Sequence, residues 1–149
     1  MKTLFVIVLA TILQSCNLLN PEPEKNVSIK TESESITVND RLSVKTTFTN
    51  NLGKEISVMN AGCNFPDFTL ERLMNNEWTI VGGPICVAIA VAPTKVENGK
   101  SYDATVSMYA ENYLVSGTYR MKFSIRDKDY GESIDERYLY SNQFKIVRQ

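Results

Sequence analysis

The sequence predicts an all-β protein, an antiparallel β-sandwich of about seven to nine strands. From Val27 onward, apolar and polar residues alternate with a period of two, which is typical of strands with one buried face. Turn-forming residues separate the alternating sets at intervals of roughly 8 to 12 residues. No stretch after residue 26 has the spacing of an amphipathic helix.

Each alternating set predicts one strand, and each turn signal predicts a connection between strands. The sets lie at residues 42–48, 56–58, 68–70, 102–108, 119–125 and 144–146. The turn signals lie at residues 50–53, 75–76, 82–84, 97–99, 116–117 and 127–131. Because the aromatic residues Trp78, Tyr102, Tyr119 and Phe123 fall on alternating positions, we expect them in the core.

The N-terminus has the pattern of an export signal. Lys2 precedes an apolar stretch at residues 4–13, and Ser15 follows as a small residue before a cleavage site. A helix of this length reaches about 15 Å, half of a hydrocarbon core of about 30 Å, so it is too short to be a stable span.

The run Leu13-Gln14-Ser15-Cys16 resembles the lipobox of bacterial lipoproteins. This resemblance implies removal of residues 1–15, acylation of Cys16 by chains such as palmitate, and anchoring in a lipid bilayer. Residues 16–26 then form a tether with two prolines, and residues 27–149 form the domain. An ordinary secretory signal followed by an incidental thiol is the alternative.

The resemblance places the protein in the cell envelope of a bacterium, in the periplasm or at the cell surface. Asn17 is not the aspartate associated with inner-membrane retention in enteric bacteria, so the outer membrane is favoured. With Cys16 assigned to lipid, Cys63 and Cys86 are expected to form a disulfide in this oxidising compartment. Two buried, unpaired thiols are the alternative, and two cysteines without histidine supply only half of a zinc site.

The run from Leu114 to Met121 contains Leu-x-x-Gly-x-Tyr and resembles the tyrosine corner of immunoglobulin-like (Ig-like) and fibronectin-III-like sandwiches. This resemblance implies that the Tyr119 hydroxyl bonds to backbone a few residues upstream. Met121 stands where an immunoglobulin domain has its second core cysteine. Residues 38–147 resemble bacterial Ig-like lipoprotein domains more widely. The residues that carry this resemblance are Asn50-Asn51 and Gly53 after the first long strand, Trp78, Gly117-Thr118-Tyr119-Arg120, and Ser141-Asn142-Gln143-Phe144 before the last strand. A narrower similarity is to the bacterial intracellular proteinase-inhibitor type of Ig-like domain.

Composition excludes several classes of function. The 16 basic and 17 acidic side chains leave a net charge of −1, which offers no surface for nucleic acid. The chain has no histidine, which excludes Ser-His-Asp and Cys-His catalysis. We therefore expect no enzyme and no cofactor, but a membrane-anchored binding or assembly domain whose partner is an envelope protein or a glycan.

Two segments are candidate binding sites. The first is an apolar segment between Pro84 and Pro93, whose Ile85, Val87 and Ile89 would act in a proteinase-inhibitory loop under the alternative function. The same pattern is also typical of a buried strand or a sheet edge.

The second segment is residues 127–136, which carries five carboxylates and is expected to be an exposed hairpin loop. Its candidate binding residues are Asp127, Asp129 and Tyr130. The spacing does not match an EF-hand, and we expect no metal.

Overall fold

The computed structural model has the predicted all-β architecture. It describes residues 25–62, 64–86, 91–110, 114–128 and 131–149. Eight strands of four residues or more form its framework within this part of the chain. They are β1 (Val27–Thr31), β2 (Ser35–Val38), β3 (Arg41–Asn50), β7 (Phe68–Met74), β8 (Glu77–Gly82), β10 (Ser101–Tyr109), β11 (Gly117–Phe123) and β13 (Phe144–Arg148).

Shorter elements connect this framework. They are β4 (Ile56–Val58), β5 (Asn60–Ala61), β6 (Phe65–Pro66), β9 (Thr94–Val96), β12 (Ile125–Arg126) and the 3-10 helix η2 (Glu136–Tyr138). None of the helical segments in the described part of the chain has the length and hydropathy needed to cross a membrane.

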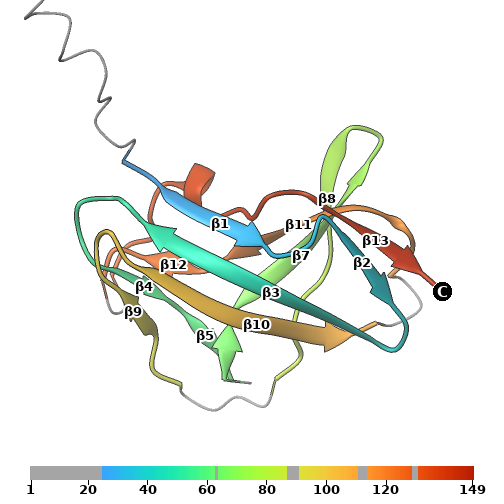
Figure 1. Ribbon diagram of the computed structural model, residues 1–149, viewed down its shortest axis with the longest axis horizontal. Coiled ribbons are helices and arrows are strands. Elements are labelled where there is room, and N and C mark those ends of the chain that lie inside the picture. The colour runs from blue at the N-terminus through green and yellow to red at the C-terminus, as the bar shows by residue number, and fades with distance from the viewer. Residues whose placement is uncertain (1–24, 63, 87–90, 111–113, 129–130) are drawn as a thin grey trace, which may run out of the picture.

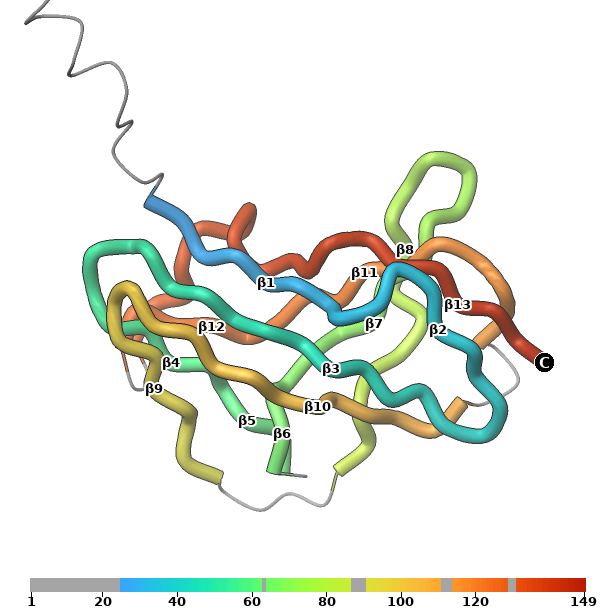
Figure 2. Tube along the Cα trace, viewed as in Figure 1, coloured from blue at the N-terminus to red at the C-terminus, as the bar shows by residue number. Residues whose placement is uncertain are grey.

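Two sheets face each other across the core (Figure 1). One sheet has the order β1-β3-β10, and the other, which we call the β11 sheet, has the order β2-β13-β11-β7-β8. Two small sheets, β12-β4-β9 and β5-β6, continue the sandwich. The chain crosses between the two large sheets after β1, so β1 pairs with β3 while β2 pairs with β13 (Figure 2). The β2–β13 pair is parallel, which is a departure from the antiparallel pattern expected from the sequence.

Alternation places the predicted apolar residues in the core. Strand β3 alternates buried and outward residues along most of its length, as the sequence predicts. Phe48 of β3 meets Phe123 of β11 edge to face, with ring centroids 4.9 Å apart, and the ring centroid of Phe68 of β7 lies 6.0 Å from that of Phe123. Tyr102 stacks on Phe48 from β10. The two sheets are therefore joined by one aromatic cluster, whose burial favours the closed sandwich.

The tyrosine corner implied by the sequence is present. Tyr119 is fully buried, and its hydroxyl donates a hydrogen bond of 2.6 Å to the carbonyl oxygen of Val115. This bond fixes the segment that enters β11 after the chain crosses from β10. Leu114, also fully buried, anchors the same segment from its other end.

Candidate binding surface

The outward face of the β11 sheet carries an arginine between two aromatic rings. The guanidinium carbon of Arg120, on β11, lies 4.4 Å from the ring centroid of Trp78 and 3.8 Å from that of Tyr140. Trp78 comes from β8, and Tyr140 comes from the segment that leads into β13. Because a guanidinium is attracted to the face of an aromatic ring, the three side chains hold one another in place. We call this group the Arg120 ladder.

The buried carboxylate of Glu71 holds the arginine of the ladder in place. Arg120 and Glu71 are direct partners in the register of β11 and β7, and the Arg120 Nε donates to Glu71 Oε2 at 2.7 Å. The Glu71 side chain is 9% exposed and the Arg120 side chain 21%. A carboxylate this deeply buried needs a charged partner, so the pair fixes the position of Arg120 on the surface.

A second ionic group extends the ladder toward η2. Lys122 Nζ donates to Glu136 Oε1 at 2.5 Å, and the Tyr140 hydroxyl donates to the same oxygen at 3.0 Å. The hydrogen bond to Glu136 raises the pKa of Lys122, and the hydrogen bonds from Lys122 and Tyr140 lower the pKa of Glu136. Both side chains are therefore charged at neutral pH, and η2 is tied to the sheet by its first residue.

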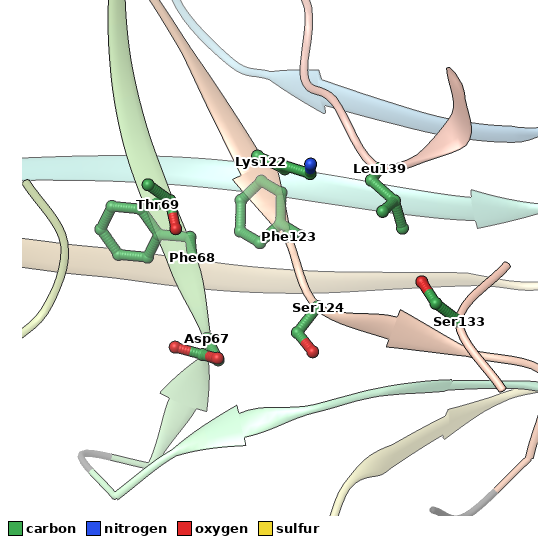
Figure 3. Close-up of a pocket in the computed structure, with 8 residues that line it drawn as sticks. All are labelled: Asp67, Phe68, Thr69, Lys122, Phe123, Ser124, Ser133 and Leu139. Carbon is green, nitrogen blue, oxygen red and sulfur yellow. The ribbon is translucent and has the colours of Figure 1, made fainter. Parts of the chain in front are cut away.

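Beside the ladder, the same face is hollowed by a cavity of about 300 Å³. Figure 3 shows its walls: β7 and the residue before it on one side, β11 in the middle, and the segment before β13 on the other. The lining residues are Asp67, Phe68, Thr69, Lys122, Phe123, Ser124, Ser133 and Leu139. The cavity is at the lower limit for a ligand site, and it offers one carboxylate, one ammonium group and three hydroxyls above an apolar floor. Such a lining suits a small polar ligand or a polar side chain of a partner.

The first predicted site, the apolar segment between Pro84 and Pro93, lies only partly within the described chain. Ile85 is 87% exposed, so the described part of this segment is not a buried strand. Val87 and Ile89 lie outside the described residues, and the exposure of Ile85 alone does not support an inhibitory loop.

The remaining predicted site residues are only partly within the described chain. Asp127 lies beside Lys54, whose Nζ is 3.5 Å from Asp127 Oδ2. Its predicted companions Asp129 and Tyr130 lie outside the described residues. In the part of the chain that the structure describes, no three His, Cys, Asp or Glu side chains gather in a way that could hold a metal ion.

Of the two cysteines predicted to form a disulfide, Cys86 lies in the described chain. Cys86 is disulfide-bonded, and its partner lies outside the described residues. Cys63 lies outside them too, so the pairing of Cys63 with Cys86 stays a prediction. Cys16 and the signal and tether that surround it also fall outside, except for the last two tether residues.

Sequence reasoning missed the Arg120 ladder because it placed Trp78 in the core. That expectation is wrong: Trp78 is half-buried on the outward face, where Arg120 covers its ring. The tight hairpin at Asn75-Asn76 sets the register that turns Trp78 outward beside Leu73. A tryptophan flanked by Glu77 and Thr79 was the available signal, but alternation alone does not say which face is buried.

Comparison with known proteins identifies the domain type. The family model described as bacterial Ig-like domain matches residues 23–145. A search of the curated proteins found no match.

Two solved structures are similar at low sequence identity. One is the Pseudomonas fluorescens alkylpurine DNA glycosylase AlkC bound to DNA containing an abasic site analog, with 9% identity and a TM-score of 0.42. The match covers 82% of this chain but only 30% of the glycosylase chain. The other is AvmM, described as catalysing macrocyclization in alchivemycin A biosynthesis, with 12% identity, a TM-score of 0.34, and coverage of 83% of this chain and 88% of that one.

Proposed function

We propose that this chain, which belongs to the bacterial Ig-like domain family, is a lipid-anchored cell-envelope protein whose domain binds a partner without catalysing a reaction. In this proposal residues 1–15 are removed, Cys16 is acylated, and the outer membrane holds the anchor. The partner is another envelope protein or a glycan, and it binds the outward face of the β11 sheet.

One observation carries the proposal: Lys25 and Asn26, the first described residues after Cys16, are already hydrogen-bonded to the folded domain. The Tyr138 hydroxyl donates to the Lys25 carbonyl oxygen at 3.0 Å, and the Asn51 amide donates to the Asn26 carbonyl oxygen at 2.8 Å. Eight residues, 17–24, separate Cys16 from Lys25. Fully extended, this segment spans about 30 Å, so an acylated Cys16 would keep the domain close to the bilayer.

The surface chemistry supports a binding role for the β11 sheet. The Arg120 ladder is held by Glu71, and the neighbouring Lys122 is held by Glu136, so this face is organised before any partner arrives. A preorganised surface loses less side-chain entropy on binding. Arginine and aromatic residues are also enriched at protein interfaces.

The anchor is tested by following the full chain in a bacterial host. We expect radiolabelled palmitate to enter the wild-type chain, and Cys16→Ser to abolish the label and release the protein from the membrane fraction. Asn17→Ser is the matched control, because it changes the neighbouring residue and keeps the thiol. A wild-type chain that takes up no label, or that stays membrane-bound after Cys16→Ser, would contradict the anchor.

The binding face is tested with the Cys16→Ser chain on a solid support and detergent-solubilised envelope. We expect a specific protein or glycan to be retained by the parent and lost with Thr69→Arg, which places a bulky side chain over the cavity. Ser101→Arg adds the same side chain to the opposite sheet and should leave retention unchanged. Retention that is absent in the parent, or equal in both variants, would contradict binding through the β11 sheet.

A further inference from the structure

Strand β8 is an exposed edge of the β11 sheet. Within the described chain it pairs only with β7, and its hairpin stands out from the body of the sandwich (Figures 1 and 2). Edge strands usually avoid pairing with other chains by carrying charged residues, above all lysine, or proline, by a β-bulge, or by being very short. Strand β8 has six residues and contains no lysine, arginine or proline, and its charged residue, Glu77, and its bulge, at Val81, lie on either side of the central residues 78–80.

The turn before β8 determines which of its backbone groups point outward. Asn75 and Asn76 have φ of 51° and 67°, which is the backbone of a two-residue type I′ turn. The pair that closes such a turn, Met74 and Glu77, is hydrogen-bonded, and hydrogen-bonded pairs alternate along the ladder. Thr79 therefore bonds to β7, while the amide and carbonyl groups of Trp78 and Ile80 point away from it.

The side chains at the same two positions form an apolar strip. Trp78 is opposite Leu73 and Ile80 is opposite Glu71, so both side chains lie on the outward face of the sheet. Ile80 is 67% exposed. The register then shifts at Val81, which ends the regular edge. The free edge is therefore short and centred on Thr79.

We propose that β8 pairs with β8 of a second copy of this chain, antiparallel, with the two-fold axis at Thr79. In this register Trp78 of each copy is opposite Ile80 of the other, and the outward backbone groups of both residues are satisfied. Glu77 is opposite Val81, so no like charges meet. Thr79 is opposite Thr79 as a non-hydrogen-bonded pair. The interface is isologous, as a two-fold dimer requires.

A second copy fits this edge because the edge complements itself. Trp78 and Ile80, whose backbone groups point away from β7, lie symmetrically about Thr79, and both are apolar. A second β8 running in the opposite direction therefore offers matching hydrogen-bonding groups and matching apolar side chains. Strands β1 and β10, the edges of the other large sheet, carry Lys30 and Asp103 near their centres, whereas the charged residue of β8, Glu77, is its first. A charge on an edge strand opposes pairing.

The pairing is expected to be weak in dilute solution because it involves few residues, and two-stranded pairing alone is marginally stable in water. If the chain is anchored as proposed above, confinement to a membrane raises the effective concentration and populates the dimer. The pairing itself does not depend on the anchor, so failure of the palmitate experiment would leave this inference standing.

The test is a cysteine cross-link at the two-fold axis in the full chain carrying Cys16→Ser. In a non-hydrogen-bonded antiparallel pair the Cα atoms are about 4.5 Å apart, within the range of a disulfide. We expect Thr79→Cys to give at least fivefold more disulfide-linked dimer on mild oxidation than Thr105→Cys. Thr105 is the matched control, an exposed threonine in the edge strand β10. The Cys16→Ser parent measures the background from the native cysteines.

A second substitution separates pairing from chance collision. Ile80→Lys in the Thr79→Cys chain should reduce the cross-link to the level of Thr105→Cys, whereas Val147→Lys, also at an exposed apolar position, should not. An unchanged melting temperature shows that each variant is folded. Equal cross-linking by Thr79→Cys and Thr105→Cys, or an undiminished cross-link with Ile80→Lys, would overturn the proposal. Loss of an envelope partner with Ile80→Lys, while Thr79→Cys stays monomeric, would assign the edge to that partner instead.

Discussion

At the scale of single residues, Tyr119 fixes the segment through which the chain passes from one large sheet to the other. Its ring is fully buried, and its hydroxyl holds the Val115 carbonyl four residues upstream. The resemblance of Leu114 to Tyr119 to a tyrosine corner implied this bond, and it could be recognised because the motif is local in sequence. The hydrogen bond is partly buried, so a carbonyl that loses this donor regains only part of its contact with water.

We expect Tyr119→Phe to lower the free energy of unfolding by about 1 to 2 kcal/mol, because the Val115 carbonyl is left without this donor. Urea denaturation measures the change. Tyr109→Phe removes a hydroxyl from a side chain that is 73% exposed, and it should leave the midpoint unchanged. Equal effects of the two substitutions would show that the corner does not stabilise the fold.

Stability should also fall at alkaline pH because of Tyr119. Burial raises the pKa of its phenol above the ordinary value of about 10, so the folded protein keeps this proton when the unfolded chain loses it. The contribution of the protonated Tyr119 phenol to the free energy of unfolding is complete below about pH 10. It is lost as the pH rises through the pKa of Tyr119 in the folded state. The stability difference between wild type and Tyr119→Phe should therefore be constant up to about pH 9 and shrink as the pH rises above about 10. A constant difference over this upper range would contradict the raised pKa.

At the scale of elements, cross-strand register decides what the surface of the β11 sheet contains. The alternation of β3, β10 and β11 was predictable, since side chains one residue apart point to opposite faces of any strand. The pairing of Glu71 with Arg120 was not, because it requires β7 and β11 to be neighbours in one particular register. The β7–β8 register then brings Trp78 to Arg120 from one side, and the bridge between Lys122 and Tyr140 brings Tyr140 from the other.

We expect Arg120→Met to destabilise the protein by roughly 3 kcal/mol, because it leaves the buried Glu71 carboxylate without its partner. The double substitution Glu71→Leu with Arg120→Met should recover most of this loss, and a double-mutant cycle in urea measures the coupling. Lys45→Met removes the partner of Glu32 in an exposed pair, and its effect should be below about 0.5 kcal/mol. Additive effects at Glu71 and Arg120 would contradict the coupling.

At the scale of the whole molecule, the parts of the chain are joined by contacts distant in sequence. Strand β2 pairs with β13, so a segment near the start of the domain lies beside its last strand. Asn142, just before β13, adds a hydrogen bond between the same two ends of the domain, because its side-chain oxygen accepts from the Thr31 amide at 2.6 Å. The predicted Cys63–Cys86 bond would add a covalent link of the same kind between the segment before β7 and the segment after β8.

We expect the double substitution Cys63→Ala with Cys86→Ala to lower the free energy of unfolding by roughly 3 kcal/mol, the value for closing a loop of this size. Urea denaturation with and without a reductant measures it. The reductant should destabilise the wild type by a similar amount and should not affect the double variant. A wild type insensitive to reductant would contradict the disulfide.

The sequence by itself determined the segments that form β3, β4, β7, β10, β11 and β13, the turns between alternating sets, the tyrosine corner and the absence of histidine chemistry. All of these depend on residue type or on spacing within a few positions. Only the tertiary structure decided that β2 joins the β11 sheet, that Trp78 faces outward, and that Arg120 lies between two rings. The physical reason is that a period of two specifies two faces for each strand but does not name its neighbours. Which strands pair, and in which register, depends on burying all the apolar faces at once.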